Sequence, residues 1–235
     1  MNMDSAKKPA ERLIELLAPV MEREGYAYRK SGHRFVKPFR HGKHEFSLIF
    51  DGRGGLVAVD AGFFVYFEAL LKQFKAALGH PCPWAAGASL LNASANPWKF
   101  WLFEERFARM TPQERAGIPS EEIHPQLRME ECVRFLTDAH ARFAVPLFQS
   151  LQTYRQLADF YKEYLTNGCS GRCRPLAENV VYLSLFLAAL LDDDLNEIAA
   201  FARGMQSVYA GHDVHKNIEK VLAYVGANDM KRLLT

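Results

Sequence analysis

The sequence has few cysteines, little net charge and no long hydrophobic run. Four cysteines in 235 residues are too few and too scattered for a disulfide framework, which fits a reducing compartment. No run approaches the roughly 18 apolar residues of a spanning helix, and no apolar stretch follows the first two lysines as in a signal peptide. A net charge of +2 does not by itself indicate nucleic acid or an anionic membrane. We therefore expect a cytoplasmic protein with no membrane partner, and the charge argues against nucleic acid.

Sequence motifs of catalysis are also missing. No serine lies in a Gly-x-Ser-x-Gly elbow, and the glycine-rich segment 51–55 joins two expected strands instead of opening a helix. The acidic pairs at 104–105 and 121–122 are adjacent in sequence, so regular structure would point the two members of each pair to different sides. We expect no catalytic residues, no cofactor and no resident metal. The lack of catalytic motifs favours a protein that is not an enzyme.

What the sequence does contain is a regular alternation of apolar and polar residues over positions 26–66. Turn residues interrupt this alternation, which predicts an antiparallel meander of about four strands. Pro38 has no backbone N–H to donate, so the second strand should end near it or lie at an edge. The aromatic run 98–103 has high strand propensity and predicts a fifth strand.

Helical periodicity surrounds this meander. Residues 10–24 and 67–78 show apolar stripes at helical spacing, and Gly25 and Gly79 follow them at the positions where helices end. The stripe of the first helix is formed by Leu13, Leu16, Leu17, Val20 and Met21. Residues 80–97 are rich in small and turn residues and predict a long irregular loop. Beyond residue 128 every segment has helical periodicity, and residues 176–191 are apolar on nearly all sides, as in the central helix of a bundle.

These elements predict an α+β fold. An N-terminal antiparallel sheet of about five strands, covered by two helices, should occupy residues 1–110. Three prolines mark residues 111–127 as a linker or a surface loop. A C-terminal helical bundle, packed on the sheet domain, should occupy residues 128–235.

Positive charge is concentrated on the expected strands. Residues 28–44 contain six cations and three histidines but no acid. Neighbouring strands would place like charges side by side, a cost that is tolerated more readily if the surface meets an acidic partner. The alternative is a solvated sheet face, with an edge that lysine and arginine protect from aggregation. The six cations, called the basic strip below, are Arg29, Lys30, Arg34, Lys37, Arg40 and Lys43.

The candidate binding residues combine this strip with histidines and tryptophans. We expect an acidic protein as the partner, contacted by strand cations and by an aromatic loop. Aromatic residues that could stack on single-stranded nucleic acid are present, but in strands they serve the core better. The candidate residues are Arg29, Arg34, Lys37, Arg40, Lys43, His41, His44, Trp84, Trp98 and Trp101.

Two groups of residues have the chemistry of metal ligands. Cys169, Cys173, His212 and His215 could supply four zinc ligands, although the two pairs are about forty residues apart. A disulfide between the two cysteines, or an ordinary loop followed by a helix start, is the alternative. Residues 192–194 are three consecutive aspartates that suggest magnesium, but they directly precede a helix, where capping is the favoured interpretation.

The order of the segments resembles a known family. The helix is followed by Tyr28-Arg-Lys-Ser-Gly-His-Arg-Phe35, Phe46-Ser-Leu-Ile-Phe50, an aromatic strand, Trp98-Lys-Phe-Trp101, and Phe143-Ala-Val-Pro-Leu-Phe148 leading into a helix. Over residues 10–165 this pattern resembles a bacterial family catalogued only as a domain of unknown function. Some of its relatives resemble immunity proteins encoded beside polymorphic toxins. The resemblance implies an α+β fold and no established active site.

Three hypotheses about function follow. The first is a non-catalytic cytosolic protein-binding module, in one form an immunity protein that neutralises a toxin. The alternative is a metal-dependent hydrolase or nuclease that uses the strand histidines His33, His41 or His44. The third is a homodimer joined through the strand at 98–103 or through the C-terminal helices.

Overall fold

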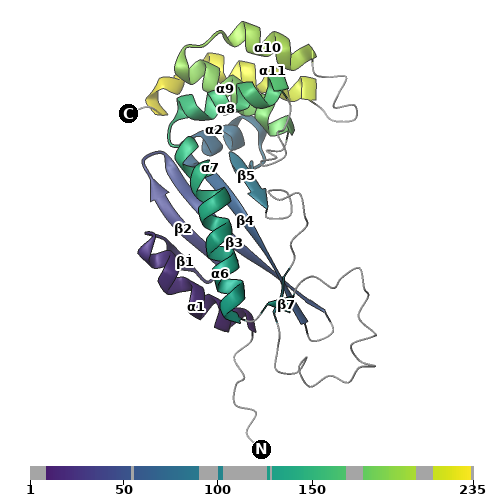
Figure 1. The fold of residues 1–235 in the computed structure, drawn as a ribbon. Helices are drawn as coiled ribbons and strands as arrows, with labels where there is room; N and C mark the ends of the chain where they lie inside the picture. Colours follow the sequence, from purple (N-terminus) through teal and green to yellow (C-terminus); the bar gives the residue numbers. More distant parts are fainter. Residues whose placement is uncertain are drawn as a thin grey trace, which may run out of the picture. The chain divides into compact units, whose positions relative to one another are not determined.

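The computed structural model describes residues 9–53, 56–89, 100–102, 126–127, 129–167, 177–204 and 214–233. It confirms the predicted α+β fold, with an antiparallel sheet in the N-terminal half and helices in the C-terminal half (Figure 1). The described sheet has the strand order β1-β2-β3-β4-β6-β7, and β5 pairs with β4 off this path.

The predicted meander is present. Its strands are β1 (Ala27–Arg29), β2 (Arg34–Phe39), β3 (Gly42–Arg53) and β4 (Leu56–Phe67). The predicted fifth strand is β6 (Phe100–Leu102), which runs antiparallel to β4. Strand β2 lies inside the sheet, and β1 pairs only with residues 34–36 of β2. Pro38, which has no backbone N–H, therefore lies beyond that pairing and close to the end of β2.

One segment differs from its predicted conformation. Residues 80–97 were expected to form a loop throughout, but β5 (Ala86–Ser89) is a strand that pairs with β4. The pairing begins where the backbone N–H of Ala85 donates to the carbonyl of Val65 at 2.9 Å. Strand β6 pairs only with residues 57–59 of β4, so another strand can pair with the rest of β4. The residues of β5 are small and have low strand propensity, so the sequence does not indicate this pairing. A further short strand, β7 (Gln126–Leu127), runs parallel to β6 at the end of the predicted linker.

The chain divides into two compact units. The first unit comprises residues 1–37, 45–63 and 89–146, and the second comprises residues 38–44, 64–88 and 147–235. Strands β2, β3 and β4 contribute residues to both units. Residues 111–125 of the predicted linker lie outside the described residues, so the predicted boundary at 111–127 stays a prediction.

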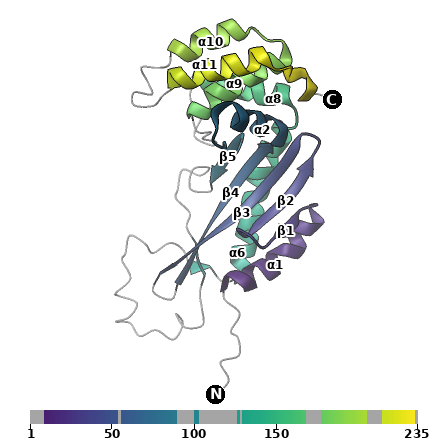
Figure 2. The same ribbon diagram turned by 180° about the vertical axis from the view of Figure 1, so that it is seen from behind.

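In the first unit, helices pack against one face of the sheet. Helix α1 (Pro9–Arg23) contacts both β1 and α6 (Met129–Ala139), and α6 passes across the sheet in Figures 1 and 2. The phenylalanines of three adjacent strands are fully buried and contact one another, which stabilises the unit by about 1.5–3 kcal/mol for each ring. These residues are Phe35, Phe46 and Phe63.

Helix α1 presents a slightly different face from the expected one. Leu13, Leu17 and Met21 are buried as predicted, and Ile14 joins them. Leu16, which was expected in the apolar stripe, is instead 40% exposed. The helix rotates by 100° per residue, so Leu16 lies beside the buried stripe and not within it.

A buried hydrogen bond connects two distant parts of the first unit. His140 opens the π-helical turn η2 (His140–Ala144), and its Nε2 lies 3.0 Å from the Tyr26 hydroxyl. Burial lowers the pKa of His140 to about 4, while nearby Glu24 raises it by less and Lys37 lowers it further. Burial also raises the pKa of Tyr26, with a smaller contribution from Glu24. The imidazole is therefore neutral at pH 7.

The second unit is mainly helical. Helix α9 (Ala177–Leu191) was predicted to be central, and it contacts α2 (Glu68–Leu78), α8 (Tyr154–Asn167), α10 (Leu195–Gly204) and α11 (Val214–Ala227). Residues 180–188 of α9 are all buried, which explains its lack of a polar face. Helix α7 (Val145–Ser150) precedes α8, and the 3-10 turn η4 (Met230–Leu233) also contacts α9.

Candidate protein-binding surface

The basic strip begins at the hairpin formed by β1 and β2. Arg29 and Arg34 are direct partners in the antiparallel register of these two strands. The predicted juxtaposition of like charges is therefore present, and such pairs destabilise a sheet. Arg29 and Lys30 are exposed, and neither makes an ion pair with any residue that the structure describes. These two residues are called the hairpin cations below.

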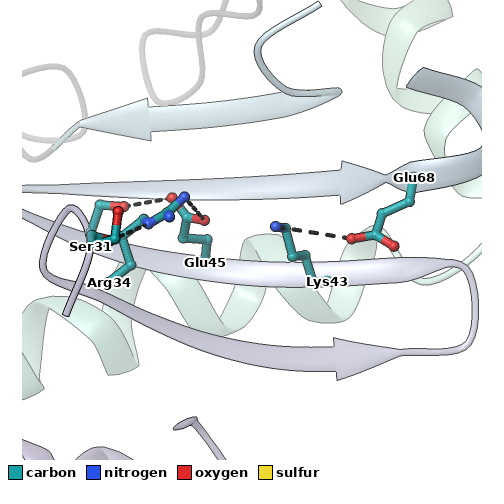
Figure 3. Close-up of polar contacts among 6 residues, drawn as sticks. Ser31, Arg34, Lys43, Glu45 and Glu68 are labelled. Carbon is teal, nitrogen blue, oxygen red and sulfur yellow. Dashed lines mark hydrogen bonds and ion pairs between the residues drawn. The ribbon is translucent and has the colours of Figure 1, made fainter. Parts of the chain in front are cut away.

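Arg34 is held by the protein itself (Figure 3). Its Nη1 lies 3.4 Å from Oε2 of Glu45, and its Nε donates to the carbonyl of Ser31 at 2.9 Å. Glu45 is only 3% exposed and also accepts a 2.7 Å hydrogen bond from the Ser47 hydroxyl. A buried carboxylate requires such partners, so Arg34 compensates Glu45 and is less available to a binding partner.

Lys37 also has an internal role. Its Nζ donates to the carbonyl of Glu24 at 2.8 Å and lies 5.6 Å from the ring centroid of Tyr26. Glu24 immediately follows α1, where the backbone carbonyls have no partner within the helix and attract a cation. Lys37 therefore caps α1, although it remains exposed.

The remaining two strip cations belong to the second unit. Lys43 Nζ lies 3.9 Å from Oε1 of Glu68 (Figure 3) and 4.7 Å from the ring centroid of Tyr66. Arg40 is exposed in the turn between β2 and β3 and makes no ion pair with a described residue. The strip is thus distributed between two units, and three of its six members have partners among the residues that the structure describes.

The strand histidines pack against aromatic rings. His44 is buried between Phe39 and Phe148, with centroid distances of 4.6 and 4.4 Å, in the second unit. His41 contacts Tyr154, and burial, followed by the charge of Arg40, lowers its pKa. Both predicted binding histidines therefore contribute to packing in the second unit.

His33, which the hydrolase hypothesis also uses, lies in the first unit. Its Nδ1 is 3.1 Å from the Tyr28 hydroxyl, and its ring meets the edge of Phe50. Among the described residues, no three His, Cys, Asp or Glu side chains gather in a way that could hold a metal ion. The described thiols Cys82 and Cys132 are free and buried, and burial raises the pKa of each to about 12, which leaves little thiolate for nucleophilic chemistry.

The structure describes two of the three tryptophans that were predicted to bind a partner. The ring of Trp84 packs on Phe64 at 4.6 Å, and its buried indole Nε1 has no hydrogen-bond partner among the described residues. Trp101 lies in β6, where its backbone is level with Ala58 of β4 and Gln126 of β7. Trp98 lies outside the described residues.

The structure describes only some of the candidate metal ligands. Cys169, Cys173 and His212 lie outside the described residues, and His215 is exposed on α11, so zinc and the disulfide stay open. The aspartates before α10 are described, and Asp194 caps that helix: its Oδ1 accepts the backbone N–H of Asn196 at 2.9 Å and of Glu197 at 3.0 Å. The capping interpretation of this segment is confirmed.

Two features of the site were not predicted. Glu45 follows the acid-free segment 28–44 directly in the sequence, but pairing of adjacent strands brings it against Arg34. The sequence signal for the pair of Arg34 and Glu45 is a carboxylate in one strand next to a strand that carries cations. The buried contact between Tyr26 and His140 joins residues 114 apart in sequence, and no local pattern indicates it.

Comparison of the chain with protein-family models, curated proteins and solved structures finds no match. Among the helices that the structure describes, none combines the length and the apolar character needed to cross a membrane.

Proposed function

We propose that this chain is a non-catalytic protein-binding module that recognises an acidic surface of another protein through the hairpin cations. The observation that carries the proposal is the register of β1 and β2, in which Arg29 lies directly opposite Arg34. Cross-strand pairs of like charge cost stability, and an acidic partner would remove that cost on binding.

The local balance of charge supports the same proposal. The end of the hairpin carries three cations, Arg29, Lys30 and Arg34, and the carboxylate of Glu45 compensates one of them. Arg29 and Lys30 are the two that remain, and both are exposed. Exposed cations of this kind accelerate association with an acidic protein and make its affinity sensitive to salt.

An immunity protein that neutralises a toxin is the particular form we propose for this module. The support is the resemblance of residues 10–165 to the bacterial family described above. A toxin whose active site or surface is acidic would present the carboxylates that the hairpin cations require.

Affinity capture from a lysate of the source cell tests the proposal. Three baits are compared: the unchanged chain, the double variant Arg29→Glu/Lys30→Glu, and the control Lys216→Glu/Lys220→Glu, which reverses two exposed charges on α11. We expect the unchanged chain and the control to retain one stoichiometric protein, which moderate salt releases and the hairpin variant fails to capture. Equal capture by the hairpin variant, or no stoichiometric protein with any bait, would refute the proposal.

A further inference from the structure

The helical unit contains a surface pocket that the basic strip does not touch. The pocket has a volume of about 340 Å³ and is lined by residues of α8, α9 and α10 and of the turn before α10; α8 and α10 each contact α9. Its apolar lining is contributed by all three helices. The apolar residues are Ala158 and Leu165 of α8, Ala188 of α9, and Ile198 and Phe201 of α10.

Phe201 makes this pocket unusual for a helix surface. It is 44% exposed, although a phenylalanine side chain gains about 1.5–3 kcal/mol from full burial. A large apolar residue that both lines a pocket and faces solvent offers new buried area to an incoming side chain. The pocket and Phe201 therefore form one apolar surface.

The charged residues around the pocket are mainly acidic. Four carboxylates and two cations line it, which gives a formal charge of −2. Arg155 holds Asp193 through two contacts of 3.0 and 2.8 Å, and Asp194 is used as the cap of α10. Asp159 and Glu197 make no ion pair with any described residue. They are the carboxylates available to a ligand.

We propose that this pocket docks a basic amphipathic segment of a partner protein. One large apolar side chain of the segment enters the pocket against Phe201, and lysine or arginine side chains beside it pair with Asp159 and Glu197. An amphipathic helix that sets apolar anchors into a groove, with charges at the rim, is a common recognition mode. The charge required of this partner is opposite to that recognised by the hairpin cations, so the two surfaces bind different features.

The volume of the pocket is sufficient for one large apolar side chain. A volume of 340 Å³ lies near the lower end of the range of about 300–1,000 Å³ for small-molecule sites. Phe201 lines the pocket and is 44% exposed, so an apolar side chain of a peptide can cover it.

Fluorescence anisotropy of a labelled helical peptide, built from leucine on one face and lysine on the other, tests the pocket. The full chain is titrated as the unchanged protein, as Phe201→Ser, and as Asp159→Lys/Glu197→Lys. We expect saturable 1:1 binding that each variant weakens by about tenfold or more. Because Phe201, Asp159 and Glu197 are exposed, these substitutions should leave the fold intact, which circular dichroism verifies.

Two controls make the outcome specific. Asp138→Lys reverses one exposed carboxylate on α6 that does not line the pocket, and should keep the affinity of the unchanged protein. A peptide with glutamate in place of lysine should not bind. Equal weakening by Asp138→Lys, unchanged affinity in the Phe201 variant, or binding of the acidic peptide would overturn the proposal. The variant Arg29→Glu/Lys30→Glu should bind the basic peptide with the affinity of the unchanged protein. The proposal for this pocket and the proposal for the hairpin cations are therefore tested independently.

Discussion

Arg29 and Arg34 are direct cross-strand partners in the register of β1 and β2, so two positive charges meet in one antiparallel pair. Only Arg34 has a carboxylate partner, Glu45 at 3.4 Å, among the residues described. Like charges directly opposite one another destabilise a sheet, so we expect this pair to lower the stability of the isolated chain.

The first prediction concerns the stability of this hairpin. Arg29→Glu converts a like-charge pair into an opposite-charge pair, and we expect it to raise the free energy of unfolding by about 0.2–1 kcal/mol. Urea unfolding at low salt measures the change, and Arg29→Gln should give roughly half of it. A variant that is more stable but binds its partner less well would separate function from folding. A loss of stability in Arg29→Glu would show that the two arginines do not repel each other.

The second prediction concerns the pH dependence of stability through His140. Its pKa is about 4 in the folded state and about 6.5 when exposed, so the unfolded chain binds the extra proton between these values. Stability should be complete above pH 6.5 and fall as the pH decreases to 4, by about 3 kcal/mol from this group. Unfolding curves at several pH values should show this slope. His140→Gln should reduce it, whereas His215→Gln, at an exposed position on α11, should retain it.

The third prediction concerns the close approach of β3 and β4 at Gly42. A Cβ atom at this position would clash with the carbonyl oxygen of Tyr66, a contact that only backbone movement can relieve. We expect Gly42→Ala to cost about 1–3 kcal/mol or more, because the backbone of β4 cannot move aside as a flexible side chain would. Gly226, in α11, has no atom within 4 Å of the corresponding position, so Gly226→Ala should raise stability by up to about 1 kcal/mol. Thermal unfolding compares the two, and equal effects would contradict this account of Gly42.

The fourth prediction concerns the aspartates before α10. Asp194→Ala removes the acceptor for two backbone N–H groups and should cost about 1 kcal/mol. Asp193→Ala removes a surface ion pair with Arg155 and should cost less, about 0.5 kcal/mol. Chemical unfolding of both variants gives the order. If Asp193→Ala proved the more harmful, the capping role of Asp194 would be wrong.

Local patterns in the sequence predicted most of the fold. Period-two alternation over residues 26–66 predicted the meander, and Gly79 ends α2 in the left-handed conformation, as its position suggested. Strand β5 escaped prediction because its pairing depends on the length of β4 that β6 leaves free. Helical periodicity beyond residue 128 does not reveal where α7 ends and α8 begins, a boundary set by Thr153 and Gln156, which cap each other's backbone N–H groups.

The candidate surface was predictable only in part. The concentration of cations and the opposition of like charges follow from the sequence and the strand register, and both are present. Which cations stay free depends on long-range contacts: Lys37 reaches the end of α1, and Lys43 reaches Glu68. His41 and His44 belong to aromatic packing because Phe148 and Tyr154, distant in sequence, lie against them. Composition alone carries no information about such contacts.

The central claim is that the hairpin cations bind carboxylates of a partner protein. The most direct measurement is the dissociation constant of the captured partner as a function of salt, for the unchanged chain and for Arg29→Glu/Lys30→Glu. The account predicts that affinity for the unchanged chain falls as salt rises, and that the variant binds more weakly with a smaller dependence on salt. Identical affinity and identical salt dependence in the two proteins would contradict it.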